Sequence, residues 1–189
     1  MKTPLGYQCT ELDCVPTTIT NGIRYLFNRN EIHPEVVKII NLYSLDTKDK
    51  NGKVGGKGTS LYSIQLISNS LNQISDFQLK CELLLKDEVK LDTISNCIED
   101  NGVVAVRVYY GDSLYHYILV TNIDEKNVYV FDPYYRKKKY EDQEIELIEN
   151  ESVKYNRKIA KERFASEELK IFAMSKVEER ECILMGKIC

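Results

Sequence analysis

Four residues in this sequence have the types and the chain order that a thiol amidase requires: Gln8, Cys14, His116 and Asp132. In such an enzyme a cysteine attacks a carbonyl carbon, a histidine moves the proton, a carboxylate orients the histidine, and an amide N–H stabilises the oxyanion. No other grouping in the chain accounts for so many reactive side chains at once. These four residues are therefore the candidate catalytic residues.

Cys14 lies at the predicted start of a helix. The apolar spacing over residues 14–27 is typical of a helix, with Pro16 in its first turn and Asp13 as a suitable N-cap. Unpaired N–H groups and the positive end of the helix dipole stabilise a thiolate at such a position. The alternative is that Cys14 is an inert cysteine packed under the helix.

Of the two histidines in the chain, His116 is the better candidate for the base. His33 precedes Pro34 at the start of another predicted helix, where we expect a surface or capping role. His116 stands within a strand of apolar and aromatic residues, so its ring needs a hydrogen-bond partner. That partner is either structural or catalytic.

Asp132 is the predicted partner of His116. The proline that follows it favours an extended backbone and ends the strand. We expect Asn122 to pair with Val128 across the intervening turn. Asp132 then lies diagonal to His116 on the same face of the sheet, within side-chain reach. A register shifted by one residue would place the two side chains on opposite faces, and Asp132 would be only a turn residue.

Gln8 is the candidate oxyanion donor. Its side-chain amide and the backbone N–H of Cys14 could together hold the oxygen that becomes negative when a carbonyl is attacked. The alternative for Gln8 is a surface residue without a catalytic role.

The remaining pattern predicts an α+β protein with a helix-rich first half and an antiparallel meander in the second half. The helices are expected over residues 14–27, 34–43, 60–72 and 89–99, and the strands over residues 77–85, 103–110, 115–121, 128–132 and 182–188. A polar loop covers residues 46–58, and the charged segment from 150 to 181 is ambiguous. We expect one domain over residues 1–189.

Composition excludes several classes of function. A net charge of −3 gives no reason to expect nucleic acid as a partner, and the basic run 136–139 is expected to be a solvated turn or edge strand. No apolar stretch is long enough to span a membrane, no signal pattern is present, and the irregularly spaced cysteines favour free thiols in the cytoplasm. With two histidines and no C-x-x-C motif, neither zinc nor another cofactor is expected.

Residues 8–18 read Q-C-T-E-L-D-C-V-P-T-T, and this motif resembles the nucleophile motif of the bacteriocin-processing double-glycine peptidases and their stand-alone relatives. The spacing from His116 to Asp132, with Pro133 closing the strand, is similar to the second half of that family. The resemblance spans about residues 1–140. It implies a papain-like fold, with a helical N-terminal half whose nucleophile begins a helix packed on an antiparallel sheet. It also implies the four catalytic roles assigned above.

The first hypothesis is therefore a cysteine peptidase that hydrolyses a peptide or protein substrate through an acyl-enzyme on Cys14. The second is an acyl or peptidyl transferase that uses the same residues with an amine acceptor. The third is a non-catalytic peptide-binding module on the same fold. Acceptor-dependent product would distinguish the first two, and a slow reaction of Cys14 with thiol-directed electrophiles would favour the third.

Overall fold

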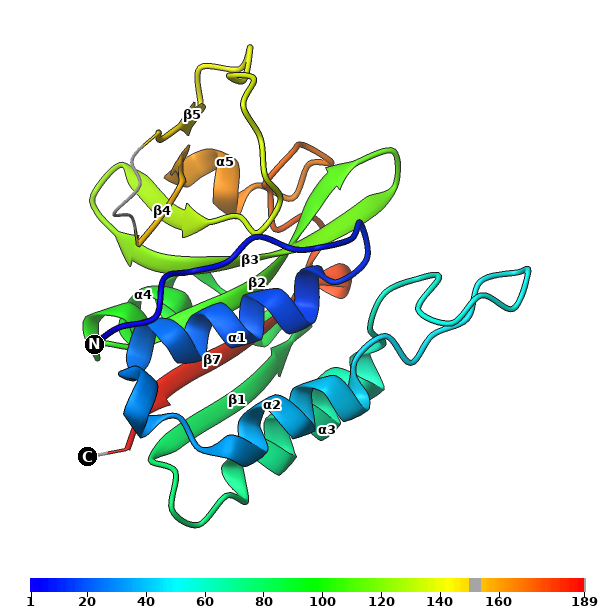
Figure 1. Ribbon diagram of the computed structural model, residues 1–189. Helices are drawn as coiled ribbons and strands as arrows, with labels where there is room; N and C mark the ends of the chain where they lie inside the picture. The colour runs from blue at the N-terminus through cyan, green and yellow to red at the C-terminus, as the bar shows by residue number, and fades with distance from the viewer. Residues whose placement is uncertain (150–153, 189) are drawn as a thin grey trace.

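The computed structural model describes residues 1–149 and 154–188, and it is an α+β fold built on one seven-stranded antiparallel sheet (Figure 1). The helices are α1 (Cys14–Leu26), α2 (Pro34–Tyr43), α3 (Leu61–Asn72), α4 (Leu91–Glu99) and α5 (Lys161–Ala165). The strands are β1 (Leu79–Leu85), β2 (Val103–Gly111), β3 (Leu114–Ile123), β4 (Asn127–Phe131), β5 (Ile145–Leu147), β6 (Arg157–Ala160) and β7 (Glu181–Lys187). None of the helices described is long and apolar enough to cross a lipid bilayer.

The strand order is β1-β7-β2-β3-β4-β6-β5. The predicted meander is correct for β2, β3 and β4, which follow one another both in the chain and in the sheet. The strand predicted over residues 182–188 is also present, as β7, but it lies between β1 and β2 in the interior of the sheet. The ladder of β1 therefore depends on a strand far later in the chain.

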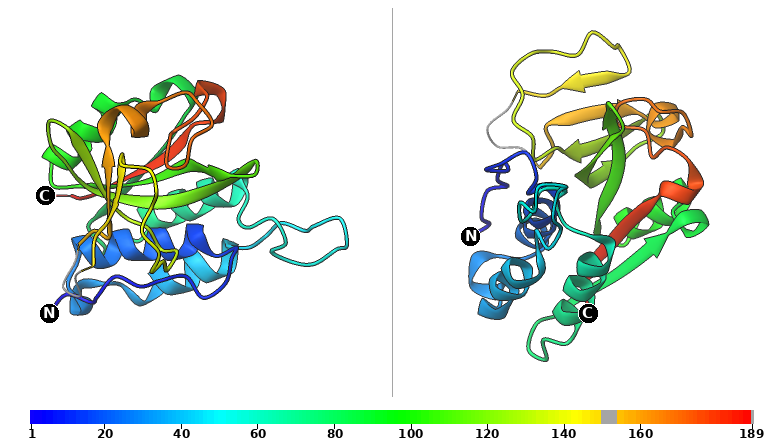
Figure 2. Two further views of the ribbon diagram at one scale, coloured as in Figure 1. Left: turned by 90° about the horizontal axis from the view of Figure 1, so that it is seen from above. Right: turned by 90° about the vertical axis from the view of Figure 1, so that its right-hand side faces the viewer.

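The predicted fold class is wrong in its arrangement of the helices. The α+β class and the antiparallel sheet are right, but the helices do not form a separate N-terminal half, and the fold is not clearly papain-like. Helices α1, α2 and α3 cover one face of the sheet, whereas α4 and α5 cover the other (Figure 2). The central strands are apolar on both faces, so each face needs a covering layer.

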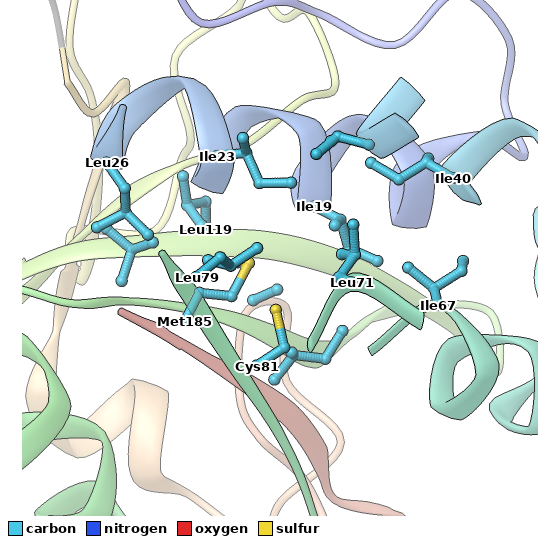
Figure 3. Packing of buried hydrophobic residues seen from close by; sticks show 14 of the residues in the cluster. Ile19, Ile23, Leu26, Ile40, Ile67, Leu71, Leu79, Cys81, Leu119 and Met185 are labelled. Atoms are coloured by element: carbon cyan, nitrogen blue, oxygen red, sulfur yellow. The ribbon is translucent and has the colours of Figure 1, made fainter. Parts of the chain in front are cut away.

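The face covered by α1 carries the larger hydrophobic cluster. Ile19, Ile23 and Leu26 point from α1 toward Leu119 and Met185 on the sheet (Figure 3). Gly22 allows this close approach: a Cβ there would lie 2.3 Å from Cε of the β7 methionine. Helix α1 is thus packed tightly on the sheet, and the position of its first residue is defined by that packing.

Candidate active site

Cys14 is the first residue of α1, as the sequence predicts, and it is half-buried. Asp13 occupies the N-cap position, but its side chain does not cap the helix. Its carboxylate instead accepts hydrogen bonds from the backbone N–H groups of Cys9 and Thr10, at 2.9 and 2.8 Å. The first-turn N–H groups beside the thiol are therefore not satisfied by this side chain, which suits a site that holds negative charge.

A buried hydrogen bond fixes the first turns of α1 against β3. The hydroxyl of Thr18, one turn after Cys14, donates to the carbonyl of Tyr117 at 3.0 Å. Tyr117 follows His116 directly in β3, so this contact holds the cysteine turn beside the histidine. The sequence alone does not predict this role for Thr18.

His116 and Asp132 form a hydrogen-bonded pair in the interior. The Nε2 atom of His116 lies 2.8 Å from Oδ1 of Asp132. The exposed fraction of the surface is 6% for His116 and 0% for Asp132. The predicted register is confirmed where it matters, because Leu119 pairs with Phe131. Nearer the turn, the predicted pair of Asn122 with Val128 is wrong: Asn122 pairs with Tyr129, because the register shifts by one between Val120 and Asn122.

The electrostatics favour a protonated ring on His116. Burial alone would lower the pKa of the imidazolium, but the hydrogen bond to Asp132 and the neighbouring Cys14 outweigh burial and raise it to about 9. Since Nε2 faces the carboxylate, Nδ1 is the ring nitrogen left for the thiol. The arrangement therefore keeps a charged imidazolium beside the Cys14 side chain near neutral pH.

Asn156 and Arg157 hold Asp132, and the sequence predicts neither role because both residues lie in the ambiguous segment 150–181. The Asn156 side chain accepts from the backbone N–H of Asp132 at 2.7 Å and donates to its carbonyl at 2.8 Å. Arg157 is 1% exposed, and its Nη2 lies 3.4 Å from Oδ2 of Asp132. The backbone N–H of Tyr134 donates to the other carboxylate oxygen at 2.8 Å. These contacts fix the carboxylate that orients the histidine.

Aromatic rings cover the buried side of the pair. The ring of Tyr110 lies 4.8 Å from that of His116 and 5.8 Å from that of Phe172, centroid to centroid. Burial, with the nearby Asp132 carboxylate, raises the pKa of the Tyr110 hydroxyl, so the ring stays neutral and polarisable beside the imidazolium. Aromatic cover of this kind limits access of water to the hydrogen bond between histidine and aspartate.

The backbone of Gln8 is hydrogen-bonded to the residue that follows Asp132, but the side-chain amide of Gln8 is partly engaged elsewhere. Its backbone N–H donates to the carbonyl of Pro133 at 2.9 Å, which ties the segment before Cys14 to the end of β4. Its side-chain Nε2 donates to the carbonyl of Thr10 at 2.7 Å, while the buried Oε1 has no partner among the described residues. One amide hydrogen remains for an oxyanion, and that role stays a prediction.

The other cysteines and the second histidine have different surroundings. Burial raises the pKa of Cys81 to about 12 and also raises the pKa values of Cys97 and Cys182, which suits unreactive thiols. Cys9 is exposed, and Cys189 lies outside the described residues. The predicted capping role of His33 is confirmed, because its Nδ1 accepts from the backbone N–H of Glu35. Within residues 1–149 and 154–188, no group of three potential ligands could hold a metal ion.

The chain was compared with protein-family models and with curated proteins. No family model and no curated protein matches it.

Replacing Arg157 by methionine is expected to lower the free energy of unfolding by about 3 kcal/mol, because the buried carboxylate of Asp132 loses its cation. Urea denaturation followed by circular dichroism measures the change. The exposed Arg29→Met variant is the matched control, and it should change stability by less than about 0.5 kcal/mol. Equal losses in the two variants would contradict the structural role of Arg157.

The raised pKa of His116 predicts a pH dependence with a definite sign. Stability linked to the protonated ring is complete below the unfolded pKa, about 6.5, and is lost as the pH rises through about 9. NMR titration of the ring should show a midpoint near pH 9 in the wild type. In Cys14→Ala the midpoint should move to lower pH, because the Cys14 side chain contributes to the raised pKa of the His116 ring. An identical midpoint in both proteins would show that Cys14 and His116 do not interact.

Proposed function

We propose that this protein is a cysteine peptidase that hydrolyses a peptide bond through an acyl-enzyme on Cys14. The observation that carries the proposal is His116, which is hydrogen-bonded through Nε2 to the buried Asp132 and has its pKa raised by both Asp132 and Cys14. A cysteine at a helix start beside an imidazolium has the two features that stabilise a thiolate nucleophile. The resemblance of residues 8–18 to the double-glycine peptidases supports the same proposal.

In the proposed first stage, the Cys14 thiolate attacks the carbonyl carbon of the substrate and the carbonyl electron pair moves to oxygen. The oxyanion is placed near the start of α1, where the Cys14 N–H and the second amide hydrogen of Gln8 are the candidate donors. The intermediate collapses, the C–N bond breaks, and the His116 imidazolium gives its proton to the leaving amine. The product is a thioester on Cys14.

In the second stage His116, now neutral, takes a proton from water as the water oxygen attacks the thioester carbon. Collapse of that intermediate breaks the C–S bond and releases the carboxylic acid, and the thiolate–imidazolium pair is restored. Asp132 keeps the ring oriented and stabilises its charged form throughout, while Asn156 and Arg157 keep Asp132 in place. A peptide or protein is accordingly the proposed substrate.

We place this activity in the cytoplasm as part of the proposal. A reducing compartment keeps thiols from forming disulfides, and each of the five cysteines that the structure describes is a free thiol. No cofactor is required for the steps above, because all the proton transfers run through His116.

The proposal is tested by labelling with iodoacetamide across pH, with each cysteine followed by mass spectrometry. Cys14 is expected to react fastest at pH 6, at which an ordinary thiol is thiolate in less than about 1% of molecules. His116→Ala should slow that reaction at pH 6 by about 30-fold or more. The exposed Cys9 is the internal control, and labelling of Cys14 no faster than Cys9 would refute the proposed nucleophile.

A second measurement distinguishes hydrolysis from transfer. Peptide mixtures incubated with the enzyme should yield fragments with free carboxyl ends. Adding a primary amine at high concentration should leave most of the product as the acid. Product that appears mainly as the new amide would identify an acyl transferase instead.

A further inference from the structure

A large cleft lies beside the candidate active site but does not include Cys14 or His116. Its volume is about 1740 Å³, and it is bounded by the N-terminal segment, the C-terminal end of α1 and the strands β4 to β6. The N-terminal segment runs along α1 on the side that faces β4 and β5 (Figure 1). We call this space the basic cleft and define it by Lys2, Arg24, Tyr25, Phe131, Lys154 and Lys187, all of which line it.

The basic cleft concentrates positive charge in a protein with a net charge of −3. Seven of its lining residues are lysine or arginine, whereas two, Asp100 and Glu149, are acidic. The pKa of Lys2 is lowered by burial and by repulsion from Lys187 and Lys154, and Glu31 offsets only part of this. Cations gathered in this way repel one another, so binding an anion there would relieve the repulsion.

Two of these cations, Lys2 and Lys187, are engaged within the chain, whereas Arg24 and Lys154 remain for a ligand. Lys2 donates to the carbonyls of Tyr25 and Leu26 at the end of α1, and Lys187 pairs with Glu31 at 3.3 Å. Arg24 forms no ion pair with any carboxylate that the structure describes. The same holds for Lys154 within the described residues, and its ammonium group lies 5.3 Å from the centre of the Tyr25 ring.

Apolar and aromatic surface lies between the cations. The Tyr7 ring lies 5.5 Å from the Phe131 ring and 5.0 Å from the Tyr135 ring, centroid to centroid. Leu5 and Leu26 also line the cleft. A ligand that fits this surface needs both carboxylates and apolar side chains, and a peptide segment supplies both. Nucleic acid fits less well, because the surface outside the cleft carries a net negative charge that would repel a phosphate backbone.

We propose that the basic cleft binds an acidic peptide segment, with Asp or Glu carboxylates on Arg24 and Lys154 and apolar side chains against Tyr25 and Phe131. This binding does not depend on chemistry at Cys14. The cleft is lined by Asn156 and Arg157, the residues that hold Asp132, so the bound segment lies close to the candidate active site.

The test uses the full chain carrying Cys14→Ala, so that no probe is consumed. A fluorescein-labelled twelve-residue peptide of alternating Glu and Leu is titrated by anisotropy, and a matched peptide has Gln in place of Glu. The Glu peptide is expected to bind about 10-fold more tightly at low salt, with affinity falling as salt is added. Equal affinity for the two peptides overturns the proposal.

Substitutions of two cleft residues test whether the Glu peptide binds in the basic cleft. Adding Arg24→Gln and Lys154→Gln to that protein should weaken binding of the Glu peptide about 10-fold, with an unchanged melting temperature. The control carries Lys48→Gln and Lys50→Gln, which remove the same charge from the loop 46–58. This loop projects away from the helices and the sheet (Figure 1), and none of its residues lines the cleft. Equal weakening in the two proteins would show a general charge effect and refute the site. Tighter binding of a twelve-nucleotide single-stranded DNA than of the Glu peptide would refute the proposed ligand.

Discussion

Replacing Cys14 by alanine is expected to reduce the rate of peptide hydrolysis by a factor of at least about 10⁴, because Cys14 is the residue proposed to form the acyl-enzyme. The thiol is half-buried at the first position of α1, so the smaller side chain should cost little stability. Hydrolysis is measured on a peptide found by screening, with fragments quantified by mass spectrometry. A melting temperature within a few degrees of the wild type verifies the fold.

Cys9→Ala is the control for this variant, because Cys9 is exposed and only five residues away in the chain. It should retain nearly full activity. Activity that survives in Cys14→Ala and disappears in Cys9→Ala would move the nucleophile to Cys9 and overturn the assignment.

Replacing Asp132 by asparagine is expected to reduce the rate of hydrolysis by about 10²–10⁴-fold. It should also lower the pH above which the remaining activity declines. The carboxylate raises the pKa of His116, and an amide in its place keeps the size of the side chain but removes the negative charge. The ring then loses its proton below the wild-type value of about 9, so the imidazolium that protonates the leaving amine disappears earlier as the pH rises. A pH–rate profile from pH 5 to 10 measures this shift.

The same variant leaves Arg157 buried beside a neutral side chain, so some loss of stability is expected. Rates are therefore compared at a temperature at which both proteins are folded. Asp87→Asn is the matched control, since it makes the same change on an exposed residue. An unchanged pH profile in Asp132→Asn would show that the carboxylate does not control the protonation of His116.

Helices α1 to α4 and the central strands could be predicted because their apolar residues follow the periods of a helix or a strand. Helix α2 was predicted over its observed range, 34–43. Helix α3 was expected to be capped by Thr59 or Ser60, and the structure selects Ser60, whose hydroxyl accepts from the Ser63 N–H. The closeness of His116 and Asp132 was also predictable, since it follows from strand register alone. The bulge near Thr121 was not, because no glycine or proline marks it.

What could not be predicted depends on contacts between distant parts of the chain. Strands β5 and β6 have only three and four residues, too few to display a period. Asn156 and Arg157 are polar and so indicate surface by type, yet both are buried because Asp132 and nearby carbonyls satisfy them. The division of the helices between two faces likewise depends on which strands pair, and this is not visible in local patterns.

The position of β7 between β1 and β2 also sets the order in which the chain can fold. During synthesis α1 and β1 leave the ribosome long before residues 181–187, so the layer beneath α1 stays open until the β7 segment arrives. Closing a loop of that length costs chain entropy and slows the final step. If Cys14 is the proposed nucleophile, a nascent chain is therefore expected to react slowly with iodoacetamide at Cys14 until β7 has been released and paired.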